Sequence, residues 1–242
     1  MVSRRTLRLY WELGAGVEAP DGEDLAEENW TPYWRESLGI VRVTSAIVLV
    51  PAWEEVPRGV ACAIRIDPGM AFGAGDHPTT RLCLRLLEEL AQNEQLADRV
   101  LDVGTGTGVL ALAAARLGAR EACGLDIDPF GFAACRRNAR LNGLETAVRP
   151  LLLSLDLLGE RYPLVLANVV ASQLTATAPH LREALAPGGR LILSGFGGDV
   201  EEKIVKAMGP TLQVAERREE EGWLALLLQL EGSAVQTQKE KT

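Results

Sequence analysis

The chain has 242 residues, 47% of them hydrophobic and 24% charged, so it can form one α/β domain with a buried core and a small appendage. The net charge of −8 and the pI near 5.0 argue against a surface that neutralises phosphates, so direct nucleic-acid binding is not expected. The sequence shows neither an apolar leader nor an apolar run of membrane-spanning length, so no membrane association is expected.

The cysteines form no CxxC or Cys/His cluster, and three of the four lie in apolar runs. Isolated cysteines of this kind are most simply reduced core residues of a cytoplasmic protein, so neither disulfides nor a bound metal is expected. We also expect a monomer. The four positions are Cys62, Cys83, Cys123 and Cys135.

The front segment, residues 1–60, differs in composition from the rest of the chain. Residues 6–13 predict a short strand, and the Gly-, Pro- and acid-rich run that follows predicts a loop. Trp30, Tyr33 and Trp34 recur at i, i+3 and i+4, so they share one face of a short helix, which most simply packs onto the main domain. Residues 46–50, rich in Val and Ile, predict a strand that ends at Pro51.

Residues 64–90, IRIDPGMAFGAGDHPTTRLCLRLLEEL, combine a turn, a glycine loop and a helix. Asp67-Pro68-Gly69 has turn chemistry, and the glycines at 73 and 75 permit a loop that lies close to another backbone or a ligand. A helix that begins near Pro78 presents one apolar face. That face carries Leu82, Cys83, Leu86, Leu87 and Leu90.

The start of this helix is a candidate ligand contact. Free N–H groups and partial positive charge at a helix N-terminus can hold a ligand carboxylate, and the hydroxyl of Thr79 or Thr80 can assist. The alternative for Thr80 is an ordinary threonine of the first turn. His77 is a weaker candidate, because a structural hydrogen bond explains it more simply than contact with a ligand.

The stretch VLDVGTGTGVLALAAARLGAREACGLDIDP, residues 100–129, organises the rest of the chain. Residues 100–103 predict a buried strand, a Gly104-Thr-Gly106-Thr-Gly108 loop follows, and residues 109–117 predict a helix that ends at a glycine. A second strand, residues 122–125, ends at Asp126. Asp128 then suits an N-cap, with a proline at the first helical position.

Two ligand classes fit a strand, glycine loop, helix and strand that ends in an acid. Dinucleotide sites need G-x-G-x-x-G, and here the last position is Val109. The observed G-x-G-x-G preceded by Asp102 instead resembles the first motif of class I S-adenosyl-L-methionine methyltransferases. In such a site Gly104 and Gly106 let the backbone approach the amino-acid part of the cofactor, and Asp126 accepts from the ribose hydroxyls. A glycine turn with a capping acid is the simpler alternative.

Two more strands bring polar residues to the same edge of the predicted sheet. After a helix over residues 129–142, residues 147–153 predict a strand that is followed by Asp156, which could accept from an adenine amino group or could equally be a solvated acid. Residues 164–167 predict a buried strand that delivers Asn168, whose simpler role is a turn or cap. Its functional role would be beside the sulfonium of the cofactor, where a target nitrogen would need a hydrogen-bond acceptor.

In the last third of the chain, Ser172 is predicted to cap a helix, and a Pro-Gly-Gly turn is predicted to lead into a strand at residues 190–194. A glycine loop at 195–198 and a helix at 199–208 are predicted to follow. Residues 212–216 and 223–230 predict two strands around a polar RREEEG hairpin, which breaks the βα alternation and is typical of methyltransferase sheets. Residues 231–242 are polar, and we expect a disordered tail.

Three sequence blocks, EENWTPYWRESL, DPGMAFGAGDHPTT and ANVVA, resemble the PrmA family, the methyltransferases of large-subunit ribosomal protein L11 (L-eleven). The resemblance implies a Rossmann-like class I methyltransferase fold, with a seven-stranded, mostly parallel sheet, an antiparallel last strand and a short N-terminal appendage. It places Thr80, Gly104, Asp126 and Asn168 on the family's cofactor-binding positions. Family members trimethylate lysine side chains and the N-terminal amine of their target.

The sequence departs from this family pattern in three places. Asp76 replaces the usual threonine, Val169-Val170 replaces isoleucine-leucine, and only about 28 residues precede the aromatic helix where the family has a recognition domain and a linker helix. We therefore predict a truncated recognition segment and linker over 1–60, a methyltransferase domain over 61–230 and a tail over 231–242. The third departure leaves the target open.

Methyl transfer from a sulfonium is an in-line displacement, so the protein mainly aligns donor and acceptor, and Asn168 is the predicted catalytic residue. By the family resemblance, the predicted function is methyl transfer from S-adenosyl-L-methionine to lysine or N-terminal amines of ribosomal protein L11. The alternatives are transfer to another protein lysine or a small molecule, or a silent scaffold that binds partners through its aromatic helix. An NAD-dependent oxidoreductase is disfavoured by Val109 and the terminal hairpin.

Overall fold

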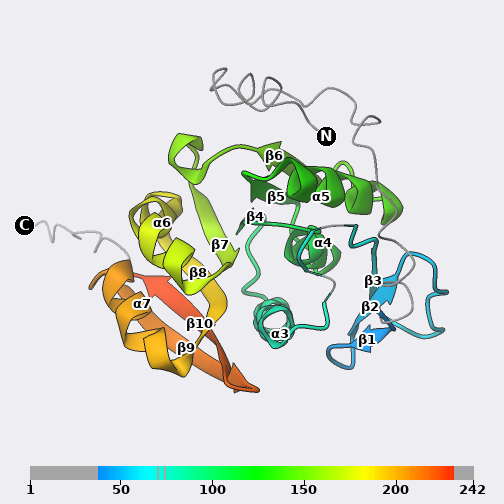
Figure 1. Cartoon of the computed structure of the whole chain (residues 1–242), viewed down its shortest axis with the longest axis horizontal. Coiled ribbons are helices and arrows are strands. Elements are labelled where there is room, and N and C mark those ends of the chain that lie inside the picture. Colours follow the sequence, from blue (N-terminus) through cyan, green and yellow to red (C-terminus); the bar gives the residue numbers. More distant parts are fainter. Residues whose placement is uncertain (1–37, 70, 74, 232–242) are drawn as a thin grey trace, which may run out of the picture.

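The computed structural model describes residues 38–69, 71–73 and 75–231 (Figure 1). Three predicted features lie outside these residues: the strand at 6–13, the aromatic helix with Trp30, Tyr33 and Trp34, and the tail from residue 232.

A seven-stranded sheet forms the centre of the molecule, with the strand order β6-β5-β4-β7-β8-β10-β9. The first five strands in this order are parallel, and β10 runs antiparallel to both of its neighbours. This arrangement confirms the predicted fold class, including the antiparallel end of the sheet. The strands are β4 (Arg99–Val103), β5 (Glu121–Asp126), β6 (Val148–Leu152), β7 (Tyr162–Asn168), β8 (Leu185–Gly197), β9 (Leu212–Glu220) and β10 (Trp223–Leu230).

Helices cover both faces of this sheet. Apolar residues of α3, α4 and α5 belong to one core cluster, and those of α6 and α7 belong to a second (Figure 1). Neighbouring strand residues divide between the two clusters: Val100 joins the first and Leu101 the second, because successive side chains of a strand point to opposite faces. The helices are α3 (Pro78–Gln92), α4 (Val109–Arg116), α5 (Pro129–Leu141), α6 (Ala171–Glu183) and α7 (Glu201–Met208), with short 3-10 turns η1 (Leu155–Leu157) and η2 (Gly198–Val200).

A small second sheet joins the front segment to the main body. It contains β1 (Val41–Arg42), β2 (Ile47–Pro51) and β3 (Cys62–Ile66) in that order. The predicted strand at 46–50 is β2, all of whose residues are buried, and β3 pairs with it in parallel. The strand β3 was not predicted from the sequence. Residues on both sides of position 60 thus share one sheet, while the proposed division of the chain at that position stays a prediction.

Local signals at helix starts and faces were accurate for α3 and α5. Asp128 is the N-cap of α5, and its side chain accepts a hydrogen bond from the Phe130 amide. The helix ends at Leu141 and is followed by Gly143 at φ +65°. The five residues of the predicted apolar face of α3 are all buried.

Several boundaries in the last third were wrong. Ser172 does not cap α6: the connection from β7 is only two residues long, so the helix starts at Ala171 with Val170 as its N-cap. The predicted glycine loop at 195–198 is mostly strand. Gly195 sits at a bulge in β8 with φ +98°, and a Cβ there would lie 2.1 Å from the Val169 carbonyl oxygen.

The Pro-Gly-Gly segment also lies within β8, which begins at Leu185, and it bulges where the pairing with β7 shifts register. The polar RREEEG run is largely strand as well, because β9 is an edge strand whose polar side chains reach solvent and α3. The turn itself contains only Glu221 and Gly222, both at positive φ.

Candidate active site

Three neighbouring parallel strands align the main candidate residues at one edge of the sheet. Val103 of β4 pairs with Leu125 of β5 and with Ala167 of β7. The residues that follow these three, Gly104, Asp126 and Asn168, therefore stand side by side at the carboxyl ends of their strands. Ligands of open α/β sheets bind at this edge.

The glycine loop requires glycines because other chain segments lie against it. Gly104 and Gly106 have φ values of +69° and +53°, in the left-handed region that favours glycine. A Cβ at Gly104 would lie 2.4 Å from Val169 Cγ1, and one at Gly106 would lie 2.4 Å from the Phe72 carbonyl oxygen. The loop is thus enclosed by the segment after β7 and by the loop that precedes α3.

Asp126 holds the glycine loop and keeps free acceptor positions. Its Oδ2 accepts from the Gly106 amide at 2.9 Å, and its Oδ1 accepts from the Asp128 amide at 2.9 Å. Partial burial raises the pKa of this carboxyl group, against the opposing effect of hydrogen bonds from the Asp128, Gly106 and Ile127 amides. Gly131 leaves room for it, because a Cβ there would lie 2.4 Å from Oδ2. A carboxylate with lone pairs left over and an exposed side is suited to accept hydroxyl groups.

Asp102 lies beneath the loop, and its residue is only 2% exposed. Its Oδ2 accepts from the Thr105 hydroxyl at 2.6 Å and from the Ala111 amide at 3.2 Å, so it joins the loop to the start of α4. Burial raises the pKa of Asp102 to about 7. In this position Asp102 supports the loop from inside, and its predicted contact with a ligand stays a prediction.

Asn168 and Thr80 meet although they are 88 positions apart in the chain. The Asn168 side-chain amide Nδ2 donates to Thr80 Oγ1 at 3.4 Å, and Thr80 is fully buried in the first turn of α3. This contact turns the NH2 group of Asn168 toward the helix and leaves the Oδ1 atom to accept a hydrogen bond from elsewhere. The pair combines two residues that the sequence predicted separately.

His77 is the N-cap of α3. Its Nδ1 atom lies 2.8 Å from Thr79 Oγ1 and accepts from the Thr79 amide at 3.4 Å. Its ring makes edge contacts with Phe72 and Trp223, at centroid distances of 5.7 and 4.8 Å. These contacts give His77 the structural hydrogen bond that the sequence favoured, and contact with a ligand stays a prediction.

Asp156 is exposed in η1, two residues past the Ser154 hydroxyl that donates to its Oδ1. That hydrogen bond lowers the pKa of Asp156. Both interpretations of Asp156, an acceptor for the adenine amino group and a solvated acid, stay predictions.

Sequence reasoning missed the residues that fix the loop before α3 in place. Thr107 is fully buried, its amide donates to the Phe72 carbonyl at 3.0 Å, and its hydroxyl donates to the Gly73 carbonyl at 2.7 Å. Asn138 of α5 donates to the carbonyls of Asp67 and Thr107 at 3.0 and 2.9 Å. A polar residue on the buried face of the predicted helix 129–142 was the one signal that could have identified Asn138.

Large apolar side chains lie exposed around the same edge. Ile127 follows Asp126 and is 64% exposed, Leu157 in η1 is 55% exposed, and Val170 after β7 is 58% exposed. Exposed apolar side chains next to a carboxylate fit a ligand that has both an aromatic base and a sugar. The residues present therefore fit a nucleoside.

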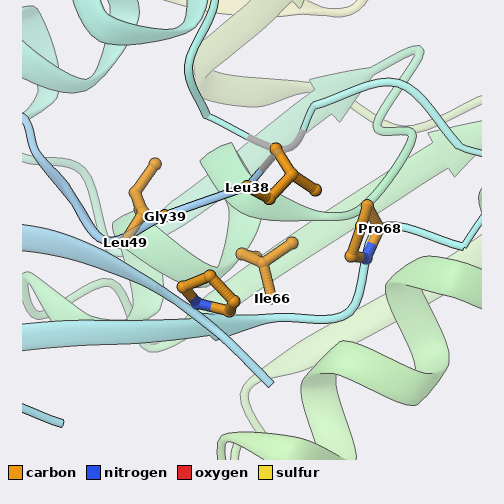
Figure 2. A pocket seen from close by; sticks show the side chains of 6 residues that line it. Leu38, Gly39, Leu49, Ile66 and Pro68 are labelled. Carbon is orange, nitrogen blue, oxygen red and sulfur yellow. The ribbon is translucent and has the colours of Figure 1, made fainter. Parts of the chain in front are cut away.

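The cavity drawn in Figure 2 lies elsewhere, at the small sheet. It is lined by Leu38, Gly39, Leu49, Pro51, Ile66 and Pro68 and has a volume of about 10 Å³. That volume holds about one water molecule, so this cavity is not a ligand site.

Comparison with known proteins decides the family. Residues 11–231 match the family described as ribosomal protein L11 methyltransferase (PrmA). The chain belongs to the ribosomal protein L11 methyltransferase family. The resemblance seen in the three sequence blocks is therefore confirmed, and with it the class of enzyme, a methyltransferase.

Individual members of the L11 methyltransferase family match over most of the chain. The protein of Symbiobacterium thermophilum is 44% identical over 204 residues, which cover 83% of this chain and 66% of that protein. The protein of Geobacter sulfurreducens is 43% identical over 222 residues, with 90% and 72% covered. The chain thus spans about two thirds to three quarters of the length of these relatives. The crystal structure of a ribosomal protein L11 methylase from Lactobacillus delbrueckii subsp. bulgaricus has a TM-score of 0.72 and 31% identity, and covers 80% of this chain and 99% of that chain.

Proposed function

We propose that this protein transfers methyl groups from S-adenosyl-L-methionine to amine nitrogens of a protein substrate, and that the substrate is ribosomal protein L11. The observation that carries the proposal is the Asn168–Thr80 hydrogen bond, which lies at the sheet edge beside the glycine loop and Asp126. The names of the family and of its members support L11 as the target. The net charge of −8 supports a protein that does not contact nucleic acid directly, and we propose that it acts as a monomer.

The residues that would hold the cofactor lie at the carboxyl edge of the sheet. The backbone at Gly104 and Gly106 would lie against the amino-acid part, Asp126 would accept from the ribose hydroxyls, and Asp156 is the candidate for the adenine amino group. When bound, S-adenosyl-L-methionine supplies an electrophilic methyl group on a sulfonium. No nucleophilic side chain is needed, because the attacking atom belongs to the substrate.

Asn168 would position the acceptor amine. A lysine has a pKa of about 10.4, so only about one molecule in a few thousand carries the neutral, nucleophilic amine at neutral pH. The Oδ1 atom of Asn168 accepts an N–H and points the lone pair toward the methyl group. Because an amide carries no charge, it does this without stabilising the ammonium form, whereas a carboxylate would raise the pKa of the amine. Thr80 keeps the amide in this orientation.

The test is incubation of the purified chain with tritiated S-adenosyl-L-methionine and purified L11, followed by mass spectrometry of the product. Transfer to lysine or N-terminal amines of L11, mostly lost with Asn168→Ala, is the expected result. Transfer to another protein of a total lysate but not to L11 would overturn the assignment of the target. Tight binding of NADH without binding of S-adenosyl-L-homocysteine would overturn the reaction itself.

We also propose that the protein is cytoplasmic, because ribosomal proteins are made in the cytoplasm and thiols stay reduced there. All four cysteines are buried and free. Within the part of the chain that the structure covers, none of the helices has both the length and the apolar character that a membrane span requires.

A further inference from the structure

An ionic cluster connects the start of α3 to the tip of the β9–β10 hairpin. Arg81, the residue after Thr80, donates through Nε to Glu220 Oε1 at 2.9 Å and through NH2 to Glu221 Oε1 at 2.7 Å. Arg85, one turn further along the helix, donates to the other oxygen of Glu220 at 2.7 Å. Glu220 thus holds two arginines of one helix. Arg81 and Glu220 are largely shielded from solvent, with side-chain exposures of 17% and 20%.

The hairpin tip has an unfavourable residue at the point where it meets Arg81. The turn contains two residues at positive φ, Glu221 at +53° and Gly222 at +79°, and such turns favour asparagine or aspartate in the first position. A glutamate in the left-handed region costs roughly 1 kcal/mol relative to a residue suited to it. The residue in this unfavourable conformation is also the turn residue whose carboxylate binds Arg81.

The same hairpin contacts α3 at its N-cap. Trp223, which pairs with Glu220 across the hairpin, lies with its ring 4.8 Å from the ring of His77. The hairpin therefore holds the helix on both sides of Thr80, through His77 before it and Arg81 after it. The bond from Asn168 to Thr80 is 3.4 Å long, near the limit for a hydrogen bond, so a small shift of the helix would break it.

We infer that Glu220 and Glu221 are positioning residues for methyl transfer, which hold the first turn of α3 where Thr80 can orient the amide of Asn168. The inference rests on the proposed function. It assigns the last hairpin of the sheet a role in the reaction, although neither glutamate touches the transferred group.

Two variants and a matched control test this inference. Glu220→Gln removes the charge that both arginines share. Glu221→Asn removes the second carboxylate and places a favoured residue in the turn, so this protein should be at least as stable as the wild type. The control is Glu89→Gln, which removes the ion pair between Glu89 and Arg218 of β9, whose charged atoms lie 3.0 Å apart. Glu89 lies on the same helix, nine residues or roughly 14 Å beyond Thr80.

With L11 and S-adenosyl-L-methionine, we expect kcat to fall roughly tenfold in Glu220→Gln and severalfold in Glu221→Asn, with KM for L11 unchanged, because misalignment slows transfer rather than docking. Glu220→Asp, which keeps the charge, should recover part of the rate, and Glu89→Gln should match the wild type. A double variant, Glu220→Gln with Thr80→Val, should be no slower than Thr80→Val alone, because the glutamate acts through the threonine.

Wild-type kcat in Glu221→Asn and Glu220→Gln would overturn the inference, and so would losses that simply multiply in the double variant. A purely structural role predicts that kcat follows the melting temperature, which is the opposite of the result expected for Glu221→Asn. If the wild-type chain does not methylate L11 at all, the proposed function fails instead, so the two failures are distinguishable.

Discussion

Replacement of Asp126 by alanine is the sharpest test of the candidate nucleoside site. The Asp126 carboxylate accepts from the Gly106 and Asp128 amides, each at 2.9 Å, and also interacts with the Ile127 amide. Its exposed side is the candidate acceptor for the two ribose hydroxyls. Hydrogen bonds to a charged group contribute at least about 1.5 kcal/mol each, so Asp126→Ala should lose about 3 kcal/mol, which raises Kd by roughly two orders of magnitude.

The assay is calorimetric titration with S-adenosyl-L-homocysteine, with Asp128→Ala as the control. Asp128 caps α5 two residues away, and its removal costs about 1 kcal/mol of stability without touching the ribose. Its Kd should therefore stay within about twofold of wild type. Because partial burial raises the pKa of Asp126, binding should weaken on acidification at a higher pH than an ordinary aspartate would give. An unchanged Kd in Asp126→Ala, or an equal loss in Asp128→Ala, would refute the assignment.

Three further outcomes are expected. Asn168→Ala should lose most of the turnover while it keeps partial affinity for the cofactor, and wild-type rates would remove Asn168 from the mechanism. Burial raises the pKa of Asp102 to about 7, above its unfolded value near 4, so the folded state holds a proton between these values and its stability falls as pH rises through that window. The urea midpoint should thus be lower at pH 8 than at pH 5, and Asp102→Asn should reduce that difference. An equal difference in the wild type and in Asp102→Asn would contradict the reasoning. Burial also raises the pKa of the Cys83 and Cys123 thiols to about 12 and about 11, so a thiol reagent should label the native protein slowly and all four cysteines after unfolding, and rapid native labelling would contradict their burial.

Local sequence signals identified the elements that depend on neighbouring residues alone. The N-cap at Asp128, the proline that follows it and the left-handed glycine at 143 delimit α5 through short-range geometry that any fold would have to satisfy. The positions of Gly104, Asp126 and Asn168 at strand ends followed in the same way, because apolar runs that stop at a polar residue mark where a buried strand ends.

Other features had no local signal. Gly195 appeared as a loop residue, but the carbonyl of Val169 occupies the space where its side chain would lie, and this contact exists only once β7 and β8 are paired. The run from Arg217 to Gly222 appeared as a polar turn. Its polarity instead reflects an edge strand that pairs on one side only, a position that the order of the strands decides.

The sequence by itself determined the βα framework, the glycine loop and the acid that follows the second strand, because each depends on the conformational preferences of consecutive residues. Only the tertiary structure decided which residues meet across the site. Thr80 reaches Asn168 over 88 positions, and Arg81 reaches Glu220 over 139. Such pairs form through the burial of both faces of one sheet, which places distant segments side by side, and no local pattern encodes that distance.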